Sequence, residues 1–214
     1  MRAIARRVLL VSLAAGLLAL ASCRRSGEAP ADSGAPRIVA LSPGVAETLD
    51  ALGLASALVG RHAFDDFSPS SIPAVGYQAG IDYEALLRVR PTHVLLEKSA
   101  AGAPPRLLEL ARARSFTVHE VPMLTLGEIR AALRDLPAIV GADHATARGE
   151  QLARDLDDAL APVPGFRERV GRVLPLYWTD PAGVAGPGSY HAEIILTLGG
   201  ELAVNTGAAY QQLD

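Results

Sequence analysis

The sequence predicts an α/β protein in which two sheet-based lobes are joined by one long helix, with the second lobe incomplete. Three observations carry this prediction. Short apolar runs alternate with apolar-periodic segments from residue 37 onward. A single long periodic segment follows Gly141, and a second alternation starts at Arg172 and has produced one strand and one helix when Asp214 is reached. Strands that alternate with helices are typical of parallel sheets covered by helices.

The first strand and helix are the most clearly marked. The apolar run 37–41 meets a Ser-Pro-Gly turn, which leads into an apolar-periodic segment that ends at Gly53, before a second short strand. Ser42 or Pro43 can open the helix, and Gly53 suits a left-handed helix stop. We expect Glu47 in the first turn, where the positive end of the helix dipole favours an anion.

The rest of the first lobe, 37–141, follows the same alternation. Residues 61–80 form a turn-rich connection without periodicity, and Asp82 can cap the helix after it. We expect helices at 83–89, 104–114 and 126–140 and strands at 92–96 and 116–121. Pro137 should kink or break the last of these helices.

The connecting helix is predicted within 142–164. Asp143 can cap it, and leucines spaced four residues apart continue until the prolines at 162 and 164. About 20 helical residues would span roughly 30 Å, enough for a strut between lobes. Residues 165–214 should then supply a strand at 172–178 and a helix at 189–198, which is too little for an independent domain.

The N-terminal residues predict export. Three arginines precede an uninterrupted apolar run at 8–20, so we assign 1–22 to a signal peptide. Leu20-Ala21-Ser22-Cys23 resembles a bacterial lipobox, and Cys23 is the only cysteine of the chain. We therefore expect lipidation at Cys23, with residues 23–36 as a polar leash. A chance cysteine after an ordinary signal peptide is the alternative.

The charge of the chain excludes one class of partner. There are 20 lysines and arginines against 23 aspartates and glutamates, and the net charge is −3. A nucleic-acid-binding protein needs a basic face, so we expect no nucleic acid partner.

Three segments together resemble a known family: 37–54, 74–97 and 172–204. They are similar to the substrate-binding proteins of ABC importers for cobalamin, ferric siderophores and haem. The resemblance runs from Arg37 to the end of the chain, although a full second lobe is longer than the segment present. It implies two Rossmann-like lobes joined by one rigid helix. It also implies a metal-chelate ligand, ABC permease subunits as partners, a monomer, no cofactor, and a place at the periplasmic face of a bacterial membrane.

Four aromatic residues lie in loops where a cleft between two lobes would form. They are Phe64, Tyr77, Trp178 and Tyr210. Flat rings suit the face of a corrin or porphyrin, although each ring could instead serve lobe packing. By the resemblance, Tyr77 also matches the position that supplies a tyrosinate to haem iron. Cobalamin is the first choice because no basic cluster accompanies the aromatics, while Arg61 and Lys98 argue for an anionic siderophore.

The resemblance gives Glu84 a role in docking. Its position matches a first-lobe surface glutamate that binds an arginine pocket of the permease. The alternative is that Glu84 only favours the N-terminus of its helix, as such residues commonly do.

Two other classes of function stay open. His62, Asp65 and Asp66 offer nitrogen and oxygen ligands, so direct binding of a divalent metal is possible, although we predict no metal site. A non-transport α/β lipoprotein or hydrolase is the other alternative. Ser42 follows a strand as a nucleophile would, but Leu-Ser-Pro is not Gly-x-Ser-x-Gly, and Pro43 has no amide to donate to an oxyanion. We therefore predict no enzyme activity.

Overall fold

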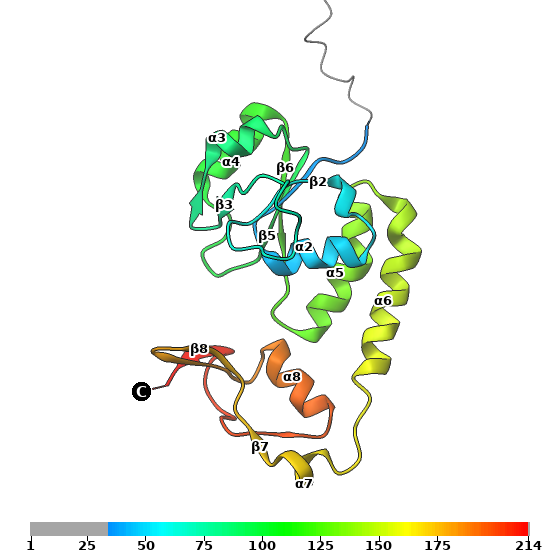
Figure 1. Ribbon diagram of the computed structural model, residues 1–214, viewed down its shortest axis with the longest axis vertical. Coiled ribbons are helices and arrows are strands. Elements are labelled where there is room, and N and C mark those ends of the chain that lie inside the picture. Colours follow the sequence, from blue (N-terminus) through cyan, green and yellow to red (C-terminus); the bar gives the residue numbers. More distant parts are fainter. Residues whose placement is uncertain (1–33, 214) are drawn as a thin grey trace, which may run out of the picture. The chain divides into compact units, whose positions relative to one another are not determined.

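A four-stranded parallel sheet lies at the centre of the first lobe, in the order β2-β1-β5-β6 (Figure 1). Its strands are β1 (Ile38–Ala40), β2 (Leu58–Gly60), β5 (His93–Glu97) and β6 (Thr117–Val121). The helices are α2 (Pro43–Ala51), α3 (Tyr83–Arg88), α4 (Pro105–Arg114) and α5 (Leu126–Ile139), with a 3₁₀ turn, η2, at Ala55–Ala57. This computed structural model describes residues 34–213. The predicted signal peptide, Cys23 and most of the leash lie outside them.

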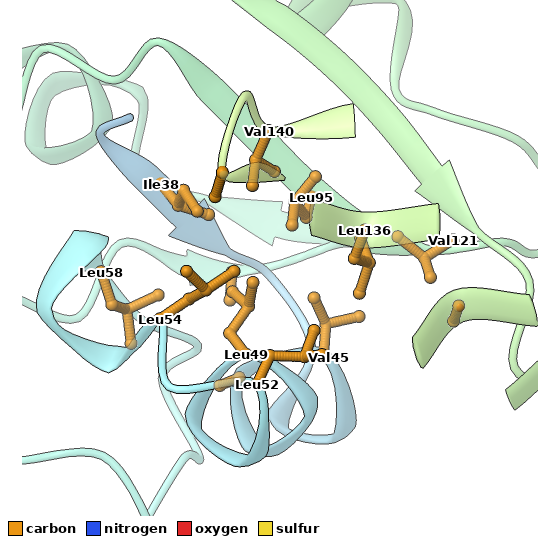
Figure 2. Close-up of a cluster of buried hydrophobic side chains, with 14 of the residues drawn as sticks. Ile38, Val45, Leu49, Leu52, Leu54, Leu58, Leu95, Val121, Leu136 and Val140 are labelled. Carbon is orange, nitrogen blue, oxygen red and sulfur yellow. The ribbon is translucent and has the colours of Figure 1, made fainter. Parts of the chain in front are cut away.

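The central sheet is buried on both faces, because successive residues of a strand point to opposite sides. Ile38 and Ala40 of β1 belong to the hydrophobic cluster under α2 and α5, which Figure 2 shows with Ile38 labelled. Val39 belongs to a second cluster under α3 and α4. Leu49 of α2 and Leu136 of α5 are fully buried in the first cluster. The predicted α/β class is therefore confirmed.

The local sequence signals place most of these helices correctly. The Asp82 carboxylate accepts from the backbone N–H groups of Glu84 and Ala85 at 3.0 and 2.9 Å, which confirms the predicted cap of α3. Gly53 follows α2 with a φ of 78°, as expected for a left-handed stop. One prediction is wrong. Because α2 begins at Pro43, Glu47 is the fifth residue of the helix and lies beyond its first turn.

A small hairpin interrupts the connection between β2 and α3. Strands β3 (Gly76–Tyr77) and β4 (Gly80–Ile81) pair antiparallel. Gly76 has a φ of 99°, and a side chain there would meet the backbone of Gly80, so this position requires glycine. The hairpin carries Tyr77 on a paired strand, although the sequence shows no periodicity in this region.

The connecting helix is shorter than the sequence predicts. A 3₁₀ turn, η3 (Asp143–Ala145), leads into α6 (Thr146–Ala159), whose 14 residues span about 21 Å. Asp143 does not cap it, because the N-cap position falls on Ala145 and makes no side-chain hydrogen bond. The shorter helix and the displaced cap have one cause, namely that the chain first makes a 3₁₀ turn.

Helix α6 packs along α5, as Figure 1 shows. Two ion pairs join the helices, Arg134 to Glu150 at 3.2 Å and Arg130 to Asp157 at 2.5 Å. Arg148 of α6 also donates to the carbonyl oxygen of Ala51 at the end of α2. The helix is thus fixed to the first lobe along its length.

The C-terminal part is organised differently from the first lobe. Its elements are α7 (Phe166–Val170), β7 (Arg172–Val173), β8 (Leu176–Thr179), β9 (Ala182–Ala185), α8 (Tyr190–Thr197), β10 (Glu201–Leu202) and β11 (Tyr210–Gln212). The expected strand 172–178 is split at Pro175. Strands β7 and β10 pair in parallel, whereas β8, β9 and β11 form an antiparallel sheet. Strand β9, which the sequence analysis did not predict, lies between the expected strand and α8.

Two hydrogen bonds join the start of α8 to the start of α5. The Tyr190 N–H donates to the Leu124 carbonyl at 2.7 Å, and the Glu193 carboxylate accepts from the Leu126 N–H at 2.7 Å. A glutamate at this position serves two helices, because it lies in the first turn of α8 and satisfies an unpaired N–H of α5. Of the helices within 34–213, none has the length and apolarity needed to cross a bilayer.

The contact between α5 and α6 makes a prediction about stability. A methyl group on Gly149 of α6 would collide with the Leu133 carbonyl oxygen of α5. Gly149→Ala should therefore lower the free energy of unfolding by about 1–3 kcal/mol, although alanine is the better helix former. Urea unfolding measures the change.

Gly127→Ala is the matched control, because its methyl group would find Thr125 Oγ1 as its nearest neighbour at 3.8 Å. It should raise the free energy of unfolding by about 0.4–1 kcal/mol. Equal stabilisation by both substitutions would contradict the close packing of α6 on α5.

Candidate functional site

Two adjoining hollows lie at the carboxyl edge of the parallel sheet. Their volumes are about 590 and 620 Å³, and Ser42, Pro43 and Glu97 line both. Ser42 and Pro43 follow β1, and Glu97 is the last residue of β5. The Ser42 hydroxyl donates to Glu97 Oε2 at 3.2 Å, which fixes the carboxylate where the hollows meet. Ligands of α/β proteins bind at this edge of the sheet. We call the two hollows together the groove.

One end of the groove is aromatic and belongs to the first lobe. His62 and Tyr77 line it, and Phe64 lies beside them, with its ring centroid 5.6 Å from that of His62 and 5.7 Å from that of Tyr77. Phe64 is 71% exposed and Tyr77 is 42% exposed, so both rings present apolar surface to solvent. The structure thus brings two of the four predicted aromatics together.

The other end of the groove is lined by tyrosines of the C-terminal part. Tyr190 at the start of α8 and Tyr210 of β11 line the second hollow. His191 lies between them, stacked on Tyr190 at a centroid distance of 3.9 Å, with its Nδ1 atom 3.2 Å from the Tyr210 hydroxyl. Tyr177 packs edge-on against Tyr210 at 5.2 Å. The C-terminal part therefore contributes an aromatic wall made of Tyr177, Tyr190, His191 and Tyr210.

The hydroxyl groups of Tyr190 and Tyr210 stay protonated at neutral pH. Burial, followed by the charges of Glu97 and Glu47, raises the pKa of Tyr190. Burial is also the first cause for Tyr210, with Tyr190 and Glu97 next, and its pKa rises to about 12. Burial lowers the pKa of His191, so its neutral ring can accept the Tyr210 proton in a hydrogen bond. The wall therefore offers neutral rings and neutral polar groups.

Trp178 lies apart from this wall. It is 63% exposed, its indole N–H donates to the Asp180 carbonyl at 2.9 Å, and it is not among the described residues that line either hollow. A bulge between Leu176 and Trp178 turns Tyr177 toward Tyr210 instead. The alternation of side chains along β8 was the available sequence signal. It does not reveal the bulge, which decides that Tyr177 and not Trp178 faces Tyr210.

A family model described as periplasmic binding protein matches residues 38–214. The chain belongs to this family. A vitamin B12-binding protein of Vibrio cholerae serotype O1 is 33% identical over 97 residues, which cover 44% of this chain and 34% of that protein. The matched region thus spans about a third of the length of this curated relative.

Solved structures of the family share the fold. The periplasmic vitamin B12-binding protein BtuF of Vibrio cholerae matches with a TM-score of 0.63 and 23% identity, over 84% of this chain and 71% of that one. The periplasmic heme-binding protein BhuT, in complex with two hemes, matches with a TM-score of 0.64 and 26% identity, over 85% and 72% of the two chains. The mixed α/β architecture with a parallel sheet is therefore that of two-lobe periplasmic binding proteins.

Glu84 lies away from the groove, on the surface of α3. It is in the first turn of the helix, its side chain is 86% exposed, and it pairs with Arg88 at 2.8 Å. An exposed pair of this kind contributes little to stability, so the carboxylate remains available to another partner. Its predicted role in docking stays a prediction.

The residues proposed as an alternative metal site are used within their own turn. The N–H of Phe64 donates to His62 Nδ1 at 3.0 Å, and the buried Asp65 accepts from Phe67 and Ser68 at 2.9 and 3.0 Å. Asp65 therefore stabilises a turn with its carboxylate. Within residues 34–213 no group of three or more histidine, cysteine, aspartate or glutamate side chains is arranged to hold a metal ion.

Proposed function

We propose that this chain is a lipid-anchored solute-binding protein that captures a metal chelate in the groove and delivers it to an ABC importer. Cobalamin is the proposed ligand, with haem or a ferric siderophore as the alternatives. The single observation that supports this function best is the groove itself, at the carboxyl edge of a periplasmic binding protein sheet with aromatic rings at both ends.

The dimensions and lining of the groove favour a large flat ligand. Each hollow is in the range of small-molecule sites, and the two adjoin at Glu97, so one ligand can extend over both. Tyr77 and Phe64 would meet one end of it, and Tyr210 the other. Trp178 is not among the described residues that line the two hollows, and we propose it as a further ligand contact outside them, at the same end as Tyr210. Ring faces bind a corrin largely by apolar burial.

Relatives support both tetrapyrrole ligands. A vitamin B12-binding protein is the curated relative at 33% identity, and a structure at 26% identity is a heme-binding protein. We favour cobalamin because the described residues that line the groove include no lysine or arginine to pair with an anionic ligand.

We propose that no reaction takes place on the ligand. Pro43, which follows Ser42, has no N–H to stabilise an oxyanion. This favours binding over acyl transfer.

Ligand titration tests the proposed function. Cyanocobalamin should quench the fluorescence of Trp178, the only tryptophan of the chain, because corrins absorb where indole emits and quenching needs no contact. Isothermal titration calorimetry should give the same dissociation constant. Tyr77→Ala should weaken binding by roughly tenfold or more, since it removes a ring that lines the groove.

Leu108→Ala is the control for this titration. Leu108 is an exposed apolar residue of α4 that is not among the described residues lining the groove, so its removal should leave the affinity unchanged. The function would be ruled out if cyanocobalamin, haemin and ferric siderophores all gave neither binding heat in calorimetry nor quenching of Trp178 fluorescence.

We propose that the mature protein is tethered to the membrane through Cys23 at the periplasmic face. Each buried methylene of an acyl chain contributes about 0.8 kcal/mol, so two or more chains hold a protein stably. Cys23→Ser should move the protein from the membrane fraction to the soluble fraction and leave ligand affinity unchanged. If the protein without any substitution is found in the soluble fraction after the signal peptide has been removed, the tether is refuted.

We propose that Glu84 docks into an arginine pocket of the permease. Glu84→Lys reverses the charge of an exposed side chain in the first turn of α3, and should weaken binding to the permease by about tenfold or more without changing ligand affinity. Glu109→Lys is the matched control, because Glu109 is also an exposed helical glutamate paired with an arginine, Arg106. Equal effects of the two substitutions on permease binding would argue against a specific role of Glu84.

A further inference from the structure

We propose that Glu97, supported by Glu47, makes the groove select chelates by charge. The groove would accept a chelate whose rim carries carboxamides and reject one whose rim carries carboxylates. This inference rests on the proposed function and names the class of ligand within it.

Glu97 occupies the centre of the groove. It ends β5 at the carboxyl edge of the sheet, and it is one of three residues that line both hollows. The Ser42 hydroxyl binds one of its oxygens at 3.2 Å. A carboxylate has about four acceptor positions, so Glu97 can accept further hydrogen bonds from a ligand while Ser42 holds it in place.

Glu47 adds a second negative charge to the same space. It lies on α2 and lines the second hollow together with Glu97 and Tyr190. After burial, the charges of Glu97 and Glu47 are the causes that raise the pKa of Tyr190, as expected for carboxylates that share a hollow with this ring.

Positive charge does not balance these carboxylates. Among the described residues that line the groove there is no lysine or arginine. The nearby Arg61 donates to the carbonyl oxygens of Asp65 and Ile72, at 2.7 and 3.0 Å, and is held within its own loop. Burial lowers the pKa of His62, with a smaller opposing effect from Asp65, so His62 is neutral at pH 7. Lys98 follows Glu97 in the chain but is not among the described residues that line either hollow. The lining of the groove is therefore acidic.

An acidic groove distinguishes ligands that have the same shape. A carboxamide N–H on the rim of the ligand would donate a charge-assisted hydrogen bond to Glu97, which is stronger than a bond between neutral groups. A carboxylate at the same point would face Glu97 and Glu47 and be repelled. Repulsion of the wrong ligand is a common source of specificity. Corrinoids with amide side chains fit this groove better than porphyrins with propionates.

A pair of corrinoids isolates the effect of charge from that of shape. Dicyanocobinamide carries amide side chains, and dicyanocobyrinic acid carries carboxylates on the same ring. Calorimetry on the unmodified protein should show tighter binding of the amide by about thirtyfold or more at low salt, and Glu97→Gln should reduce that ratio by about tenfold, because one like-charge contact is removed. Glu47→Gln should reduce it by a smaller factor.

Glu150→Gln is the matched control. Glu150 lies on α6, which contributes no described residue to the groove, so the ratio should not change. A second measurement uses only the unmodified protein, so it does not depend on whether a variant folds. Raising the salt concentration from about 0.01 M to 1 M shortens the Debye length from about 30 to about 3 Å, so the carboxylate corrinoid should bind more tightly at high salt while the amide changes little.

The outcomes separate the two proposals. If the unmodified protein binds both corrinoids with equal affinity at every salt concentration, or if Glu97→Gln leaves their ratio unchanged, charge selection is overturned and the proposed function stands. If the protein binds none of these corrinoids, haemin or ferric siderophores, the proposed function itself fails, and charge selection fails with it.

Discussion

The burial of the parallel sheet on both faces is the constraint on which the rest of the molecule depends. Because β1 sends Ile38 into one hydrophobic cluster and Val39 into the other, helices must cover both sides. The chain then leaves each strand at the same edge, and the loops after β1 and β5 place Ser42 and Glu97 side by side. The groove is thus a consequence of the two-sided core.

The sequence predicts what depends on neighbouring residues and misses what depends on distant ones. The Asp82 cap and the Gly53 stop are local, and both are confirmed. In the antiparallel sheet, β9 pairs with β11, so that Ala185 lies opposite Tyr210, and no sequence periodicity indicates this distant pairing. Pro175, which cannot donate a ladder hydrogen bond, explains why the expected strand 172–178 is split, and this signal was present in the sequence.

The candidate site was predictable to a similar degree. Phe64, Tyr77 and Tyr210 were found because loop aromatics are few in this chain, and the structure places Tyr77 and Tyr210 in the lining of the groove with Phe64 beside it. Tyr177 was missed because a bulge decides which side chain of β8 faces Tyr210. Glu97 closes the apolar run of β5, so the last residue of a buried strand was the signal that pointed to it.

The hydrogen bond between Tyr190 and Leu124 joins two backbone groups, the N–H of Tyr190 and the carbonyl oxygen of Leu124. Its strength is therefore indifferent to which side chains occupy the two positions, short of a proline at 190. A mutation can therefore replace the aromatic side chain that contacts the ligand while the hydrogen bond still holds the aromatic wall in place. Ligand specificity can thus evolve at this position without a change in the surrounding fold.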